Sequence, residues 1–80
     1  MTPQSLRALA ALTDAASRKN MVFAADLHAM GRHAEGFEME RRVQTQEANA
    51  TDLRIQAVQA EASEGVRASI FETVQPRSVA

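Results

Sequence analysis

The chain has 80 residues, no cysteine and a formal net charge of −1 at pH 7. This length allows one domain at most, and a chain of this size buries only about 60% of its unfolded surface on folding. Disulfides, metals or association with another chain usually add the missing stability. The absence of cysteine excludes a disulfide framework and a thiolate metal site. The balanced charge also gives no long-range attraction to nucleic acid or to anionic lipid.

The apolar residues are numerous but mostly small. Alanine accounts for 16 of the 80 residues, and Leu, Ile, Val and Phe together account for only 16 more. That share lies at the edge of the range in which chains become disordered. The near-zero net charge and the scarcity of Pro and Gly argue against disorder. We therefore expect an all-α chain that completes its core by oligomerisation, with a dimer favoured.

The sequence shows no membrane-spanning or targeting segment. Its apolar runs are well short of the roughly 18 residues that indicate a transmembrane helix. The N-terminus lacks a charged start followed by an apolar stretch and a cleavage site, so we expect a cytoplasmic protein. Eight arginines against one lysine suggest a bacterial or phage origin, a hypothesis from composition alone.

A first helix is predicted to begin at Thr2-Pro3, a hydroxyl N-cap followed by proline at the first helical position. From there apolar residues recur with the seven-residue period of a coiled coil. One row holds Leu9, Ala16, Phe23, Met30 and Phe37, and the interleaved row holds Leu6, Thr13, Asn20, Leu27 and Ala34. The pattern predicts a seam in a left-handed coiled coil or a helical hairpin.

The extent of this helix is open at two positions. Asn20 either ends the helix after Arg18-Lys19, or lies buried in the seam, where an Asn fixes the register of paired helices. Gly31 costs about 1 kcal/mol relative to Ala inside a helix. Because the heptad phase continues through both positions, we expect one helix over about 3–46 with a hinge at Gly31.

A second helix is predicted over about 50–75. Asn49 and Asp52 suit a helix start, and Pro76 disfavours continuation of the helix. The residues after it, 76–80, have the composition of a frayed tail. The expected fold is one helical domain over 1–80: a long helical hairpin or a short coiled-coil bundle of two helices, or of three if the first one breaks.

The second helix carries two apolar faces. Its main stripe is Ile55, Val58, Ala62, Val66, Ile70 and Val74, and a weaker face holds Leu53 and Phe71. Two apolar faces on one helix indicate two neighbours. In so short a chain, we expect the second neighbour to be another molecule.

Two sets of residues follow from these patterns. The helix-pairing core is expected to consist of Leu6, Leu9, Phe23, Leu27, Met30, Phe37, Ile55, Val58, Val66 and Ile70. Contact with a partner protein is expected at Met21, Met39, Leu53 and Phe71. Met is a flexible side chain that is common on helix-binding surfaces, although Met21 and Met39 could instead fill gaps against the second helix.

His28 and His33 are the only imidazoles. On a continuous helix they point about 140° apart, so they cannot bind one metal unless Gly31 breaks the helix between them. We expect no metal and no cofactor. Histidine changes charge between about pH 5 and 8, so a His near the seam could make association pH-sensitive.

The sequence argues against an enzyme, because it has no cysteine, no Gly-rich phosphate loop and no Ser, His and carboxylate arrangement at a useful spacing. We expect a non-enzymatic protein-binding module (an adaptor, assembly factor or inhibitor) that acts through apolar helix faces. One alternative is a dimeric nucleic-acid-binding regulator of the antitoxin or phage repressor type, which would use Arg18, Lys19, Arg41 and Arg42 from two chains. Nucleic acid is the less favoured partner, because Glu35, Glu38 and Glu40 offset Arg41 and Arg42.

A further alternative is a structural helical subunit of a larger assembly. The general shape, a cysteine-free hairpin rich in Ala and Arg with a heptad seam, resembles flagellar or type III export stalk proteins, secretion chaperones and small phage inhibitors. This resemblance concerns architecture alone, and architecture does not determine function.

Overall fold

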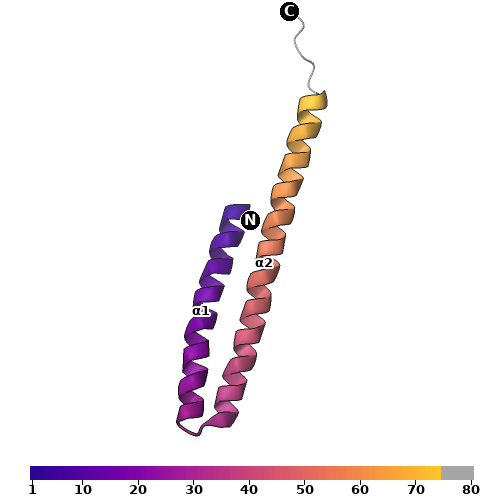
Figure 1. Cartoon of the computed structure of the whole chain (residues 1–80). Coiled ribbons are helices and arrows are strands. Elements are labelled where there is room, and N and C mark those ends of the chain that lie inside the picture. The colour runs from indigo at the N-terminus through magenta and orange to yellow at the C-terminus, as the bar shows by residue number, and fades with distance from the viewer. Residues whose placement is uncertain (75–80) are drawn as a thin grey trace, which may run out of the picture.

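The computed structural model describes the backbone of residues 1–74 and the side chains of residues 1–67. Helix α1 spans Pro3–Ala29 and helix α2 spans His33–Val74. The two helices lie antiparallel and side by side, and α2 continues beyond the N-terminal end of α1 (Figure 1). The expected all-α helical hairpin is therefore confirmed. The expected tail, 76–80, lies outside the described residues.

Helix α1 begins where the sequence predicts. Thr2 is the N-cap, with extended backbone angles, and its hydroxyl accepts a hydrogen bond of 3.1 Å from the Ser5 backbone N–H. Pro3 follows in the first turn, where its missing N–H removes no helical hydrogen bond. These two residues fix the start of the helix.

Gly31 ends the first helix in a tight turn, so the predicted helix over 3–46 is wrong. Gly31 has a φ of 77°, in the left-handed region that residues with a Cβ rarely adopt. Its N–H donates to the His28 carbonyl at 3.0 Å, and the Arg32 N–H donates to the Leu27 carbonyl at 2.8 Å. This is the Schellman arrangement, which satisfies the last carbonyls of a helix. The seven-residue spacing from Met30 to Phe37 suggested one continuous helix, but the turn at Gly31 lies between these two residues.

Helix α2 begins at His33 and runs unbroken through 46–50, so the new helix start that Asn49 and Asp52 predict is wrong. Arg32 precedes it and forms an ion pair with Glu35, whose hydrogen bond and charge raise the pKa of the Arg32 guanidinium. Asp52 lies inside the helix and accepts a hydrogen bond of 2.8 Å from Gln56. The polar segment before it does not end the helix, because Gln46 contacts α1 across the hairpin.

The interface between the helices, here called the interhelical seam, follows heptad spacing in both. On α1 it consists of Leu6, Ala10, Thr13, Ser17, Asn20, Ala24 and Leu27, all buried or half-buried. On α2 it consists of Gly36, Met39, Val43, Gln46, Ala50, Leu53, Ala57 and Ala60, also buried or half-buried. The spacing of three and four residues is that of a coiled coil.

Small residues occupy every seventh position of this seam. Ala10, Ser17 and Ala24 alternate with larger residues on α1, and α2 offers small residues such as Ala50 and Ala57. Short side chains let two helix backbones approach closely, because the interaxial distance depends on the residues at the contact. The seam is therefore narrow, and on α1 its large apolar side chains lie at its two ends, at Leu6 and Leu27.

The middle of the seam is polar but satisfied. The Asn20 side-chain amide donates to the Gln46 side-chain oxygen on α2 at 3.0 Å. Thr13 and Ser17 each donate a hydroxyl hydrogen bond to a carbonyl of α1, at 2.8 and 3.0 Å. No buried side-chain N or O atom lacks a partner in the part of the chain that the structure describes. Asn20 thus lies in the seam and does not end the helix, which resolves the alternative left open by the sequence.

Ion pairs along one flank show the register of the two helices. Arg7 pairs with Glu61, and Asp14, seven residues further along α1, pairs with Arg54, seven residues back on α2. The same step continues to a hydrogen bond between His28 and Glu40 at the turn, with Nε2 and Oε1 2.6 Å apart. Ala10 therefore lies opposite Ala57, and Ala24 lies opposite Val43. Exposed pairs of this kind stabilise by at most about 1 kcal/mol each, but they disfavour a shifted register.

We predict that Gly31→Ala destabilises the hairpin by about 1–2 kcal/mol, because alanine is strained at positive φ. Chemical unfolding followed by circular dichroism measures the change. Gly65→Ala is the matched control: its added Cβ also has nothing within 4 Å, but Gly65 lies inside helix α2 without a positive φ, so alanine there should stabilise by up to about 1 kcal/mol. A single continuous helix through residue 31 would reverse the sign, because alanine would then stabilise it.

Candidate interaction surface

The structure divides the predicted helix-pairing core into two groups. Leu6 and Leu27 are buried in the interhelical seam. The following predicted core residues lie outside it and are exposed in the hairpin: Leu9, Phe23, Met30, Phe37, Ile55, Val58 and Val66. The side chain of Ile70 lies outside the described residues. Whether these exposed residues pair with another molecule stays a prediction.

The seam lies to one side of the predicted stripe, because small residues are buried between the helices and the large residues next to them are not. The row of Leu6, Thr13, Asn20 and Leu27 is in the seam, as expected, but its companion row starts at Ala10 and not at Leu9. Moving one residue along a helix turns the row by about 100°. Two Ala-rich faces pack closely and leave Leu9 and Phe23 at the margin, 39% and 48% exposed.

The partner-contact candidates are also divided. Met21 is 49% exposed and lies on the flank of the ion pairs, opposite Glu47. Met39 and Leu53 are half-buried in the seam, so their main contact is with α1. That position corresponds to the gap-filling alternative for Met39. The Phe71 side chain lies outside the described part of the chain.

A stripe of residues on α1 outside the seam, here called the α1 outer stripe, repeats the spacing of three and four residues. It consists of Leu9, Leu12, Ala16, Lys19, Phe23, Asp26 and Met30, of which Ala16 is half-buried and the others are exposed. Its large apolar members are between 39% and 68% exposed. The stripe carries two charges of opposite sign, Lys19 and Asp26, one heptad apart. An amphipathic helix is the structure that matches such a stripe.

A hollow lies beside this stripe, between α1 and α2. It has a volume of about 150 Å³ and is lined by Phe23, Leu27, Glu35, Glu38, Met39 and Arg42. Three of these residues are apolar and three are charged. A hollow of this size and mixed lining can hold one side chain of a partner.

A second stripe of exposed residues, the α2 outer stripe, faces away from α1. It consists of Ala48, Thr51, Ile55, Val58, Ala62 and Gly65, again spaced by three and four residues. All six are exposed, and none is charged. Like the interhelical seam, it mixes small residues with a few β-branched ones. It therefore has the pattern of a helix-packing face without a partner in the hairpin.

The turn brings the two histidines together. Gly31 breaks the helix between them, and the Nδ1 atoms of His28 and His33 are 2.8 Å apart. If the Nε2–H of His28 donates to Glu40, its Nδ1 accepts the Nδ1–H of His33. Protonation of both rings would set two N–H groups against each other. The described residues hold no group of three His, Asp or Glu side chains arranged to bind a metal.

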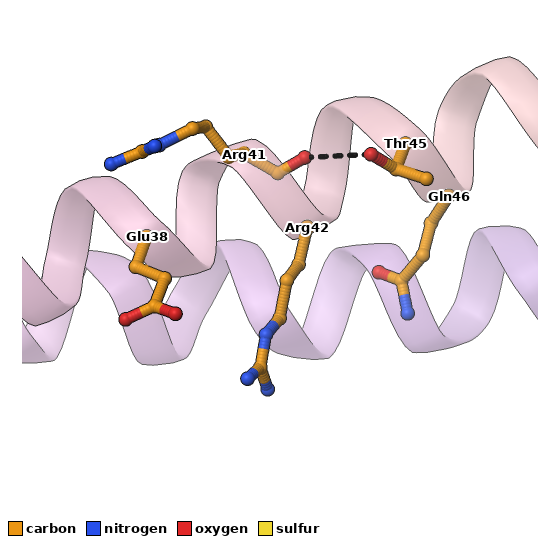
Figure 2. A pocket seen from close by; sticks show the side chains of 5 residues that line it. All are labelled: Glu38, Arg41, Arg42, Thr45 and Gln46. Atoms are coloured by element: carbon orange, nitrogen blue, oxygen red, sulfur yellow. Dashed lines mark hydrogen bonds between the residues drawn. The ribbon is translucent and has the colours of Figure 1, made fainter.

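The basic pair Arg41-Arg42 does not form one cationic patch. Figure 2 shows the Arg41 side chain pointing away from α1 and the Arg42 side chain reaching across it. With Glu38, Thr45 and Gln46 they line an open hollow of about 400 Å³ on α2. The carboxylate of Glu38 on its rim reduces the positive charge there.

No helix in the described part of the chain is long and apolar enough to cross a membrane. No protein-family model matches the chain, and no curated protein and no solved structure matches it.

We predict that Ala24→Leu destabilises the hairpin by about 1–3 kcal/mol, because a larger side chain overpacks the seam. Ala24 is 1% exposed. The neighbouring Ala25 is exposed, so Ala25→Leu should change stability by less than about 0.5 kcal/mol. Urea unfolding of both variants measures the difference. Equal effects at the two positions would contradict the small-residue seam.

We predict that Gly36→Ala stabilises the hairpin only when His28 is removed. An added Cβ at Gly36 would lie 2.7 Å from His28 Nε2, so the ring would have to leave Glu40. In a His28→Ala background, the substitution should instead add about 1 kcal/mol from helix propensity. A double-mutant cycle by urea unfolding measures the coupling. The same gain in both backgrounds would show that His28 does not pack on Gly36.

Proposed function

We propose that this protein is a non-enzymatic helical module that binds another protein through the α1 outer stripe. The observation that carries the proposal is the arrangement of large and small residues. The seam is built mostly from small side chains, whereas Leu12, Phe23 and Met30 are 68%, 48% and 59% exposed. An exposed patch of large apolar residues usually marks an interaction site.

The partner contact we propose is an amphipathic α-helix. The stripe has apolar residues at the spacing that one helix presents to another. Lys19 and Asp26 lie within it, so the bound helix should carry an acidic residue opposite Lys19 and a basic residue opposite Asp26. The hollow beside Phe23 would hold one apolar anchor side chain of that helix.

Binding of this kind also fits the energetics of the chain. The hairpin buries mostly alanine, serine and a few larger side chains, and burial stabilises by only about 25 cal/mol per Å² of apolar surface. Two helices packed in this way have a marginal core. A partner helix on the stripe would bury Leu12 and Phe23 and so stabilise the folded hairpin by mass action.

Nucleic-acid binding ranks second. It requires many cations on one surface. Arg7, Arg32 and Arg54 form ion pairs with carboxylates in the hairpin, and Arg41 and Arg42 point in different directions (Figure 2). A dimer would have to bring the remaining cations together.

We predict that a photo-crosslinking amino acid captures a protein partner from the α1 outer stripe and not from the opposite face of α1. The experiment is made in the cells that produce the protein, with the probe at Leu12 or Phe23 and with matched controls at Ala11 and Ala25. All four positions are exposed, so they differ only in the face they occupy. Mass spectrometry then identifies the crosslinked peptide.

The expected result is one partner crosslinked from both stripe positions, through a peptide with apolar residues at helical spacing. With that partner purified, Phe23→Glu should weaken binding by about 30-fold or more, as for a central contact. Val22→Glu, on another face, should leave binding unchanged. Equal crosslinking from stripe and control positions would overturn the proposal.

A further inference from the structure

The α2 outer stripe has the pattern of the interhelical seam but contacts no helix of the hairpin. In the hairpin, the interhelical seam pairs heptad-spaced residues of two antiparallel helices. Ile55 and Val58 of the stripe are 50% and 58% exposed. A hollow of about 270 Å³ lies among Thr51, Arg54, Ile55, Val58 and Gln59. Four of these residues have the spacing that surrounds one side chain in coiled-coil packing.

We propose that this stripe is the interface of a two-fold symmetric homodimer, in which α2 packs antiparallel against α2 of a second copy. Val58 lies at the two-fold axis and faces the partner's Val58. Ile55 then faces the partner's Ala62, and Thr51 faces the partner's Gly65. Each larger side chain off the axis meets a small one, as close packing requires.

A hollow on α2 supports this register. The partner's Ala62 would enter the hollow that Thr51, Arg54, Ile55 and Val58 surround. Because the contact is symmetric, this exchange occurs twice in the dimer.

Charge complementarity selects the same register. In the hairpin, Ala24 faces Val43, and the residues directly before them, Phe23 and Arg42, line a common hollow. By the same geometry, when Ile55 faces the partner's Ala62, Arg54 lies beside the partner's Glu61. These residues are about half exposed while paired with Asp14 and Arg7, so each retains a free side.

Neighbouring registers are disfavoured by like charges. If Ile55 faced the partner's Ile55, Arg54 would lie beside the partner's Arg54. If Ala62 faced the partner's Ala62, two Glu61 carboxylates would meet. Like charges at such positions disfavour the wrong alignment. In the proposed register, four charges alternate across the two chains: Arg7, Glu61, the partner's Arg54 and the partner's Asp14.

This dimer does not use the α1 outer stripe, so it does not depend on the proposed partner protein. The experiment mixes two full-length variants, Ile55→Cys and Ala62→Cys, one carrying a tag that shifts its mass. The chain has no cysteine of its own, so every disulfide reports one contact. Mild oxidation in a glutathione buffer is followed by non-reducing electrophoresis. The control mixture uses Ala11→Cys and Ala25→Cys, on the exposed far face of α1.

The expected result is more disulfide between the Ile55→Cys and Ala62→Cys variants (the mixed disulfide) than between two copies of either variant (the unmixed disulfides). The control mixture should give mixed and unmixed disulfides in the proportions expected from random encounters. Unmixed disulfides in excess would mean parallel helices, and chance proportions at 55 and 62 would mean no contact; either overturns the proposal. Sedimentation equilibrium supplies the second measurement. The wild type should reach twice the 8.7 kDa chain mass, and a monomer at all concentrations would overturn the dimer.

Val58→Glu tests the proposed contact between the two Val58 side chains at the two-fold axis. It should weaken the dimer by about 30-fold or more while the helicity of the hairpin is kept, because Val58 is exposed in the single chain. An unchanged dimer would contradict the interface. Should the variant lose helicity instead, the disulfide result for positions 55 and 62 decides.

Discussion

The close approach of two helices through small side chains is the constraint on which the rest of this structure depends. Ala10, Ala24, Ala50 and Ala57 are at most 1% exposed, which makes them the most deeply buried positions of the seam together with Leu27 and Val43. A seam this narrow cannot also accommodate Phe23 or Leu9, so the large apolar residues lie at its margins or on the outer faces. The exposed stripes are therefore a consequence of how the hairpin packs.

The same constraint explains why polar groups fix the alignment. A seam of alanines tolerates sliding, because one small residue fits as well as another. The Asn20 and Gln46 pair inside the seam, and the Arg7–Glu61 and Asp14–Arg54 pairs beside it, are satisfied in one register only. At the turn, Gly31 fixes the reversal, and Gly36 leaves room for the His28 ring. Apolar burial supplies stability, and these contacts supply specificity.

Much of the fold follows from sequence patterns, but the choice of seam does not. Thr2-Pro3 predicted the helix start, and the row of Leu6, Thr13, Asn20 and Leu27 predicted half of the seam. The companion row was predicted from the most hydrophobic residues, starting at Leu9. The packing instead uses the smallest residues, starting at Ala10. Gly31 was recognised as a hinge, yet its left-handed conformation depends on the helix-end hydrogen bonds that no periodicity shows. The flank ion pairs join residues about 40 to 54 positions apart, and only the register reveals them.

Isotope-edited methyl NOE spectroscopy tests the small-residue seam most directly. Mixed labelling separates contacts within one chain from contacts between copies. The small-residue seam predicts intramolecular cross peaks between Ala10 and Ala57 and between Ala24 and Val43. Cross peaks from the Leu9 methyls to Ala57 in their place would show that large residues fill the seam, and would contradict the account.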